Sequence, residues 1–354
     1  MVGSIIRSLL MLVTHLALEP SAKDDPPRRY EFAEKHMGST FTIILYSDDE
    51  PTARRASRAA FNRIAALDAS FSDYQPGSEL MRLCEKAGGP PVPVSADLFT
   101  ILQHSKSMYE RSEGAFDVTI GPLVRLWRRA RRDKKLPSTE SLDRARSLVS
   151  SGFMILDPKA RTIALTKPGM KLDLGGIAKG YASDAAVKVL RGEGIARCLV
   201  AGSGDVVAAE PPPGQEGWTV GIGPLEAPLS APERVLLIKN MAVSTAGDTE
   251  QFVEIEGKRY SHIVDARTGL GKIDRASVTV VARNGMTADA LDTAVYAMGP
   301  ERGLPLVEKT EGASAYIVRT TESGKQVHES RRFRELPRAS KEKAVSPERI
   351  LPAR

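Results

Sequence analysis

Short apolar and β-branched segments separated by turns fill the second half of the chain, and they constrain its fold more than any other feature. Segments such as FMILD, TIALT, RCLVAGSGDVVAA, VLLIKNMAVSTAG and SVTVVA have the length and composition of strands. The turn Glu256-Gly257-Lys258 suits a hairpin. Because strands joined by short turns pair antiparallel, the sequence predicts an α+β fold with mainly antiparallel sheets flanked by helices, and not a doubly wound parallel sheet.

Helical spacing of apolar residues marks a smaller set of segments. It predicts helices over residues 51–69, 95–112 and 179–192, and a short helix after Ser78. Ser78 and Ser95 are expected to be the N-caps of their helices. TADALDTAVYAMG is expected to be a helix with Thr287 as its cap. FDVTIGP is interpreted as extended, and AYIVRT as the last strand before a polar turn.

The two ends of the chain differ from the part between them. Residues 1–22 carry the basic Arg7, an apolar stretch and the small residues Ser21-Ala22, which is typical of a secretory signal peptide; an apolar N-terminal arm is the alternative. Residues 23–34 are interpreted as a polar linker, 35–330 as one folded domain, and 331–354 as a basic, disordered tail. A working signal would make the protein periplasmic or exported, and without one it would be cytoplasmic.

Charge and cysteine content exclude some functions. The chain has a net charge of +6, and residues 331–354 alone hold eight Lys or Arg against three acidic residues. The rest is nearly neutral and shows no basic stripe of the kind that nucleic-acid-binding domains carry. The basic run from Arg128 to Lys135 is interpreted as a solvated helix end or loop, with steering of an anion as the alternative. Cys84 and Cys198 lack metal spacing and are expected to be unpaired buried thiols, with a disulfide as the alternative.

A histidine near the end of a predicted strand is a candidate base. His262 in YSHIVDARTG is followed by Asp265, Arg267 and a Thr-Gly turn. Loops that adjoin strand ends are where sites are built, and a neutral imidazole can accept a hydroxyl proton near neutral pH. The alternative is a core histidine bonded to Asp265.

Three oxygen-bearing side chains share one face of the predicted helix near residue 290. Asp289, Asp292 and Thr293 lie at i, i+3 and i+4, and their carboxylate and hydroxyl oxygens suit a hard cation such as magnesium. An acidic residue that complements the helix dipole is the alternative.

Two glycine turns and two aromatic segments are weaker candidates. DLGGIAKG leads from Asp173 to Lys179 at a helix start, where glycines allow close approach and the helix favours phosphate. A bare turn is the alternative there, and a tight β-turn is the default interpretation of Gly202-Ser203-Gly204-Asp205. Tyr74 and Phe116-Asp117 could offer surfaces to a planar ring, although packing explains each aromatic side chain alone.

Taken together, these segments resemble the ApbE-type FAD:protein FMN transferases, a family of flavin transferases. The resemblance follows the family's order over most of the chain. The matching segments are MGSTFTI, FSDYQPGSELMRL, GAFDVTIGPLVRLW, KLDLGGIAKGYASDAA, AGSGDV, WTVGIGP, VSTAGD, YSHIVDARTG and TADALDTAVYAMG.

The resemblance implies a fold, an activity and a set of site residues. The fold would be T-fold-like, and residues 35–330 would form the catalytic domain. Magnesium would bind a backbone carbonyl at Gly176 and the side chains of Asp289 and Thr293, with Asp292 adjacent, and His262 would be the base. FAD would be bound through Met37, Tyr74, Ala115, Phe116, Asp117, Asp173, Lys179 and Ile263.

The activity implied is transfer of FMN from FAD to a threonine hydroxyl of an acceptor protein, through a phosphoester bond and with release of AMP. A pyrophosphatase that gives free FMN and AMP, and a non-catalytic flavin-binding protein, are the alternatives. Two positions depart from the family pattern. Ala201-Gly202-Ser203-Gly204-Asp205 stands where Asn-x-Gly-Gly-Asp is common, and Ala266 stands where proline is common.

The partners follow from the same resemblance. FAD would be the substrate and Mg²⁺ the cofactor, and no nucleic acid is expected. The acceptor would be a subunit of a redox or ion-pumping complex, which could bring the enzyme close to a membrane.

Overall fold

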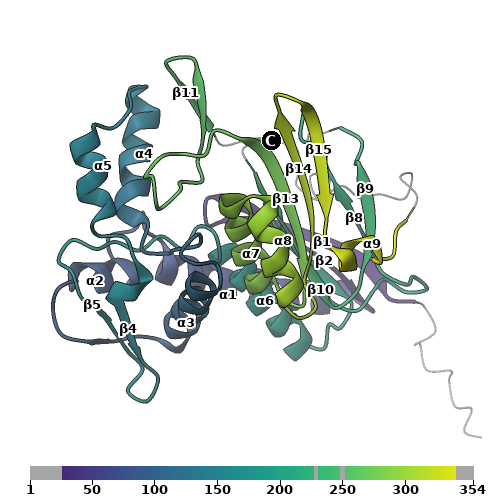
Figure 1. Cartoon of the computed structure of the whole chain (residues 1–354). Helices are drawn as coiled ribbons and strands as arrows, with labels where there is room; N and C mark the ends of the chain where they lie inside the picture. The colour runs from purple at the N-terminus through teal and green to yellow at the C-terminus, as the bar shows by residue number, and fades with distance from the viewer. Residues whose placement is uncertain (1–25, 227–229, 248–251, 340–354) are drawn as a thin grey trace, which may run out of the picture.

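The computed structural model describes residues 26–226, 230–247 and 252–339, and its centre is a sheet of eight strands (Figure 1). All neighbouring strands of this sheet pair antiparallel. The fold is therefore α+β with mainly antiparallel sheet, as predicted. In spatial order the strands are β1 (Arg28–His36), β2 (Ser39–Ser47), β6 (Cys198–Gly202), β7 (Asp205–Ala208), β10 (Met241–Gly247), β13 (Arg275–Ala282), β14 (Ser314–Thr321) and β15 (Gly324–Glu329).

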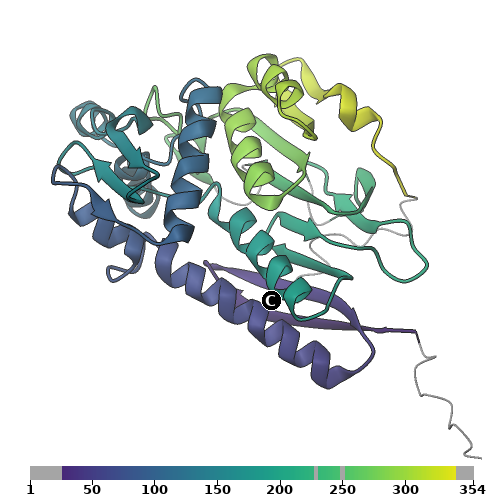
Figure 2. The same cartoon turned by 90° about the horizontal axis from the view of Figure 1, so that it is seen from below.

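Helices cover one face of this sheet and bury the largest apolar cluster against it (Figure 2). We call this cluster the main core. The two that matter most for the site, α6 and α7, pack against each other. The opposite face is covered by the hairpin β8–β9 and the short helix α9, which form a second core. The helices of the first layer are α1 (Glu50–Phe71), α6 (Ala178–Gly192), α7 (Gly285–Met298) and α8 (Pro300–Lys309), and the second layer has β8 (Trp218–Ile222), β9 (Arg234–Ile238) and α9 (Arg331–Arg334).

Beside the sheet lies a region built from short elements. The pair α4–α5 and the hairpin β11–β12 project side by side from it (Figure 1), and they share a third apolar cluster. The elements are α2 (Glu79–Glu85), α3 (Ala96–Arg111), α4 (Gly121–Asp133), α5 (Thr139–Arg146), the 3₁₀ turn Ser151–Phe153, the small sheet β3 (Val92–Pro93), β5 (Thr162–Leu165) and β4 (Met154–Asp157), and the hairpin β11 (Phe252–Ile255) and β12 (Lys258–Ser261). We call α4, α5, β11, β12 and the loop up to residue 274 the lobe.

Local sequence signals explain several of these elements. Ser78 and Ser95 cap α2 and α3 by accepting from the N–H groups of Met81 and Leu98, as the sequence predicted. The β11–β12 turn has positive φ angles at Glu256 and Gly257, which matches the right-handed twist of a hairpin. Cys84 and Cys198 are buried and unpaired, as expected. None of the helices in the described ranges has both the length and the apolarity needed to cross a bilayer.

The structure corrects five expectations. The predicted linker 23–34 is wrong from Arg28 onward, because β1 begins there and pairs along its whole length with β2. The predicted disordered tail is wrong for residues 331–339, since α9 buries Phe333 completely. Helix α7 is capped by Asn284, not by Thr287, whose N–H group donates to the Asn284 side chain. Residues 1–22 and 340–354 lie outside the described residues.

The other two corrections concern missed elements. FDVTIGP is not extended throughout, because its last two residues begin α4, and α5 was not predicted. AYIVRT is followed by a further strand, β15, at the edge of the sheet. Both errors have one cause: the charged segments 125–146 and 324–329 contain too few apolar residues for a periodic signal.

The crossing of α6 and α7 depends on a glycine pair. A Cβ atom on Gly180 would lie 2.1 Å from the carbonyl oxygen of Gly285. We expect Gly180→Ala to lower the free energy of unfolding by about 1–3 kcal/mol, the usual cost of forcing a methyl group into a packed site. Gly192, also in α6, has nothing within 4 Å of such a Cβ, so Gly192→Ala is the matched control and should be neutral or stabilising. Equal denaturation midpoints for the two variants would contradict this account of the crossing.

Candidate active site

Helices α6 and α7 run antiparallel and bring the predicted metal residues together. At one end of the pair a Cβ on Gly176 would lie 2.8 Å from Thr293 Oγ1, so the turn before α6 touches the middle of α7. One turn along, the Gly180 N–H donates to Asp289 Oδ2 at 2.9 Å. The contact requires glycine at positions 176 and 180 because any side chain would hold the two segments apart.

Three carboxylates and one lysine form a buried cluster at this contact. Lys179 Nζ lies 2.7 Å from Asp205 Oδ2 and 4.0 Å from Asp289 Oδ1. Ser244 Oγ lies 2.6 Å from Asp292 Oδ2 and also contacts Asp205 Oδ1. Asp205, Asp289 and Asp292 are each at most 3% exposed. We call Lys179, Asp205, Ser244, Asp289 and Asp292 the acidic cluster.

The charges of this cluster are out of balance. Burial, followed by the charge of Asp205, raises the pKa of Asp289 to about 7. Burial, followed by the charges of Asp289 and Asp205, raises the pKa of Asp292 well above its usual range. Burial alone would lower the pKa of Lys179, but the charges of Asp205 and Asp289 outweigh it and raise that pKa. With all groups ionised the cluster carries two negative charges in excess, which is unfavourable in a buried site.

The residues present fit a divalent cation. Asp292 Oδ1 is buried and has no hydrogen-bond partner among the described residues. Ser244 has one hydroxyl proton, so it can satisfy only one of the two carboxylates that it contacts. A hard cation would satisfy the second and cancel the excess charge. In the described part of the chain no three acidic, His or Cys side chains are arranged to hold a metal by themselves, so backbone, hydroxyl and substrate oxygens would have to complete the site.

A second group of charged residues surrounds Asp173 and includes an arginine that the sequence analysis did not single out. Arg128 of α4 donates to Asp173 Oδ2 at 3.1 Å and to Asp73, and its guanidinium group lies 4.1 Å from the ring centre of Tyr74. Tyr74 is 74% exposed, so its ring is available to a ligand. Asp173 Oδ1 accepts from the Gly175 N–H at 2.8 Å, which fixes the turn that touches Thr293. Burial, followed by the charge of Asp73, raises the pKa of Asp173.

The family resemblance implies that FAD binds at Asp173, and on that expectation replacing Arg128 should weaken FAD binding. In Arg128→Met, Asp173 loses a charged hydrogen bond worth about 1.5–3 kcal/mol, so we expect the KM for FAD to rise about tenfold or more. The pKa of Asp173 should rise further, and FAD binding should then weaken as the pH falls, at a higher pH than in the wild type. Arg128→Lys should give an intermediate KM, because one ammonium group cannot bond both carboxylates in the fork geometry of arginine. An unchanged KM and pH profile for Arg128→Met would contradict this role.

The three residues expected at 115–117 are held in different ways. Phe116 is 3% exposed and belongs to the main core, so its side chain is not free to stack on a ring. Asp117 Oδ1 accepts from the Thr119 N–H, the Thr119 hydroxyl and the Ser151 hydroxyl, at 2.7–2.9 Å. These bonds make the Asp117 side chain a support of the loop. A ligand at residues 115–117 would therefore contact the backbone of this segment, and not the side chains of Phe116 and Asp117.

Met37 lies in the tight turn between β1 and β2. Its φ angle is +50°, and its N–H donates to Asp68 Oδ2 at 2.8 Å. The structure thus places Met37 at the end of the sheet, packed against the main core.

His262 and Ile263 follow β12 where the lobe meets the main core. Ile263 packs against the main core, whereas the next residue, Val264, belongs to the apolar cluster of the lobe. The loop is held by Trp127 of α4, whose indole N–H donates to the Gly269 carbonyl at 2.8 Å. His262 is half-buried in this loop. Asp265 Oδ1 accepts from the N–H groups of Arg267 and Thr268, and so closes the turn after it.

One short segment links the two groups of charged residues. Asp173 accepts a hydrogen bond from Arg128 of the lobe, and three residues later Gly176 packs against Thr293 of α7, which lies outside the lobe. The loop of His262 lies at this same junction, because its neighbours pack on both sides. Tyr74, Asp173, Gly176, Thr293 and the loop of His262 therefore lie along the junction between the lobe and the rest of the described chain, which we call the body.

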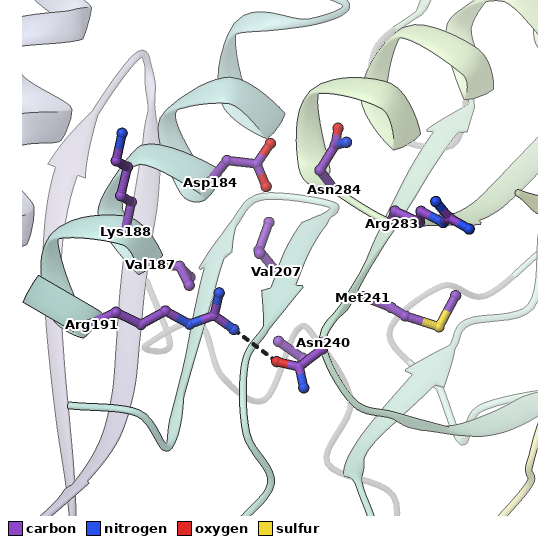
Figure 3. Close-up of a pocket in the computed structure, with 10 residues that line it drawn as sticks. Asp184, Val187, Lys188, Arg191, Val207, Asn240, Met241, Arg283 and Asn284 are labelled. Atoms are coloured by element: carbon purple, nitrogen blue, oxygen red, sulfur yellow. Dashed lines mark hydrogen bonds between the residues drawn. The ribbon is translucent and has the colours of Figure 1, made fainter. Parts of the chain in front are cut away.

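A cavity of about 480 Å³ lies at the other end of the α6–α7 pair (Figure 3). It is lined by Asp184, Lys188 and Arg191 of α6 and by Arg283 and Asn284 before α7, among others. In Figure 3 the head groups of Lys188 and Arg283 point away from Asp184, and Arg191 bonds Asn240 at 2.7 Å. The cationic groups do not converge there, and the cavity contains none of the predicted site residues.

Asp184 should make stability depend on pH. Its carboxylate accepts from the Gly285 and Met286 N–H groups, and burial raises its pKa to about 6 from the ordinary value of 3.8. Between these values the folded chain holds a proton that the unfolded chain has released, so stability falls as the pH rises through this window, by up to about 3 kcal/mol. We therefore expect the unfolding free energy of the wild type minus that of Asp184→Asn to be lower above the window than below it, by the same amount. If this difference does not change with pH, Asp184 is not the source of the pH dependence.

Four functional candidates escaped sequence analysis. Arg128 was considered only as part of a basic run, and Asp73 was passed over in favour of its neighbour Tyr74. Asp205 was interpreted by default as part of a tight β-turn. Ser244 lies in the matching segment VSTAGD, but nothing singled it out within that segment. Asp205 alone could have been suspected, because an acidic residue at the start of an apolar strand needs a partner.

The chain is similar to a family of known proteins. The family model described as the ApbE family matches residues 37–317. An FAD:protein FMN transferase of Klebsiella pneumoniae (strain 342) is 32% identical over 294 residues, which cover 82% of this chain and 89% of the relative. An FAD:protein FMN transferase of Escherichia coli (strain K12) is 29% identical over 293 residues, covering 80% of this chain and 82% of the relative.

Solved structures give the same result. The flavin transferase ApbE from Vibrio cholerae matches with a TM-score of 0.79 and 27% identity, covering 88% of this chain and 100% of that one. The ApbE protein from Thermotoga maritima matches with a TM-score of 0.78 and 27% identity, at the same coverage.

Proposed function

Because this chain belongs to the ApbE family, we propose that it is a magnesium-dependent enzyme that transfers FMN from FAD to a threonine hydroxyl of an acceptor protein. Its relatives are FAD:protein FMN transferases, so the chain is an enzyme that acts on FAD as a flavin donor. The magnesium, the threonine and the phosphoester product are our proposal. The observation that carries it is the acidic cluster, with its excess negative charge beside the Gly175-Gly176 turn.

The proposed site holds FAD along the junction between lobe and body. Tyr74, Arg128 and Asp173 bind one part of the flavin nucleotide, and the trio Asp73, Arg128 and Asp173 has a net charge of −1, which suits an uncharged ring or sugar. The pyrophosphate lies against Gly175 and Gly176, where the glycines allow close approach.

Asp289, Thr293 and the Gly176 carbonyl would hold magnesium, with Asp292 beside them. When bound, the metal neutralises phosphate charge and acts as a Lewis acid. Lys179 is held by Asp205 and stays charged, so it adds positive charge on the same side. Charge stabilisation and positioning of this kind supply most of the acceleration in phosphoryl transfer.

His262 acts as the general base. It takes the proton from the threonine hydroxyl of the acceptor, and the oxygen attacks the phosphorus on the FMN side of the pyrophosphate. A bond forms between the threonine oxygen and this phosphorus, and the bond from phosphorus to the bridging oxygen breaks. AMP leaves with the bridging oxygen, and FMN remains on the acceptor as a phosphoester.

The decisive experiment uses the purified chain, FAD, MgCl₂ and a threonine-bearing acceptor. Flavin fluorescence of the acceptor on a denaturing gel and release of AMP are followed together. A fluorescent acceptor with one AMP per flavin, abolished by EDTA or by threonine-to-alanine substitution in the acceptor, supports the proposal. AMP and free FMN without a labelled acceptor would show a pyrophosphatase, and FAD binding without AMP would show a flavin-binding protein.

We further propose that the enzyme works outside the cytoplasm, on an acceptor that belongs to a redox or ion-pumping complex and lies close to a membrane. The support is the signal-like sequence of residues 1–22. Fractionation of cells that express the full chain, or the chain from residue 23 onward, tests this. Recovery of both forms in the cytoplasm would refute it.

A further inference from the structure

Helix α4 carries an unusual concentration of positive charge. Residues 121–135 contain seven Lys or Arg residues and one acidic residue, a net charge of +6, which equals the net charge of the whole chain. Arg125, Arg129, Arg132, Lys134 and Lys135 are exposed. Arg125, Arg129 and Arg132 lie at i, i+4 and i+7, so they form one stripe along the helix. This corrects the expectation that the folded part of the chain has no basic stripe, because the helix aligns residues that the sequence shows only as part of a charged run.

Most of this stripe is not neutralised by the described residues around it: Arg132 pairs with Asp133, whereas no ion pair is described for Arg125 or Arg129. The ion pairs described for α4 are those of Arg128 with Asp73 and Asp173 and that of Arg132 with Asp133. On the neighbouring helix α5, by contrast, Arg144 pairs with Glu140 and Arg146 with Asp143. Like charges at i and i+4 destabilise a helix, as for Arg125 and Arg129. The helix dipole favours cations only in the last turn, so it does not explain Arg125 or Arg129.

The stripe begins at the proposed active site. Arg128 lies on the same helix, one residue before Arg129 and four before Arg132, and it contacts Asp173 and Tyr74. The opposite side of α4 holds the loop of His262 through Trp127. Helix α4 is therefore the rim between the site and solvent, and in Figure 1 it stands beside the β11–β12 hairpin at the projecting end of the molecule.

A small hollow interrupts the basic surface. It has a volume of about 200 Å³ and lies where α4 turns into α5. Its lining combines the cations Arg129 and Lys135 with the hydroxyl groups of Ser138 and Ser141 and apolar residues such as Leu126. One acidic residue, Asp133, also lines it, and its carboxylate is paired with Arg132, so the two cations leave the hollow with a net positive charge. Such a lining suits one carboxylate side chain with its aliphatic stem.

We infer that the outward face of α4, with this hollow, is the docking surface for an acidic segment of the acceptor protein. This inference rests on the proposed function, because it concerns how the protein substrate reaches the same site. An acidic segment next to the modified threonine would be attracted along the stripe toward Arg128 and would present its hydroxyl group at the junction between lobe and body. Charge complementarity of this kind raises the rate of encounter and fixes the orientation of the partner.

The test compares two synthetic peptides with one threonine each, the first flanked by Asp and Glu and the second by Asn and Gln at the same positions. Binding is measured by fluorescence anisotropy, and FMN transfer by flavin fluorescence. We expect the wild type to bind the acidic peptide about tenfold more tightly at an ionic strength of about 0.02 M, with the preference lost at about 0.5 M. The triple variant Arg129→Gln, Arg132→Gln, Lys135→Gln should lose the preference for the acidic peptide in both assays.

The matched control removes the same charge elsewhere. Arg54, Arg55 and Arg58 are exposed on α1 and pair with Glu50, Glu193 and Glu34, away from the lobe. Their triple replacement by Gln should keep the wild-type preference. Equal loss of preference in both triple variants, or none in the α4 variant, would overturn the inference.

Two further outcomes separate this inference from its rivals. Binding of the acidic peptide without FMN transfer to any acceptor would contradict the proposed function and leave the surface in place. If the α4 variant kept its peptide preference but lost binding to vesicles of phosphatidylcholine and phosphatidylglycerol, the stripe would be a lipid-binding surface, and the inference would be wrong.

Discussion

Replacing His262 by alanine should lower the rate of FMN transfer about 10²–10⁴-fold, the usual contribution of a positioned general base. FAD binding should survive, because the flavin contacts proposed for Tyr74, Arg128 and Asp173 do not involve the imidazole. The fold should survive too. The loop is held by the Trp127–Gly269 bond and by the packing of Ile263 and Val264.

The measurement separates binding from chemistry. FAD affinity is read by quenching of flavin fluorescence, and transfer by single-turnover labelling of the acceptor. His328→Ala is the matched control, since His328 lies on the edge strand β15 and should tolerate the change at the wild-type rate. A wild-type transfer rate for His262→Ala would remove His262 as the base.

The second large effect is expected for Asp289→Asn. The asparagine oxygen can still accept the Gly180 N–H, so the contact between α6 and α7 should be kept. The charge that would bind magnesium is lost. We expect the magnesium concentration for half-maximal transfer to rise about 100-fold or more, because even the outer partners of metal ligands are worth about 10–100-fold in affinity.

Stability provides an independent readout of the same variant. The metal-free Asp289→Asn protein should be at least as stable as the metal-free wild type, because one of three mutually repelling buried carboxylates is gone. Magnesium should raise the unfolding temperature of the wild type, since a ligand that binds only the folded state stabilises it, and should fail to raise that of the variant. Asp184→Asn, which removes a half-buried carboxylate from the same helix pair, should keep the normal magnesium response. An unchanged magnesium requirement for Asp289→Asn would remove this residue from the ligand set.

Some parts of the site can be predicted from the sequence and others cannot. Asp289, Asp292 and Thr293 were found because a helix places residues at i, i+3 and i+4 on one face, whatever surrounds it. Gly176 could be placed there only by the family resemblance, and the structure adds the reason: Thr293 leaves no room for a side chain. Phe116 shows the opposite case, since an aromatic residue in a matching motif turned out to be core.

The sequence by itself determined the antiparallel α+β fold, most strands, the helix caps at Ser78 and Ser95, and the helical face that carries Asp289 and Thr293. Tertiary structure alone decided that Arg128 bonds Asp173, that Asp205 joins Asp289 and Asp292 around Lys179, and that β1 and α9 belong to the folded body. The reason is physical: periodicity and capping act over a few neighbouring residues. The burial that raises the pKa of Asp289 to about 7 depends on contacts such as the one with Gly180, 109 positions away in the chain.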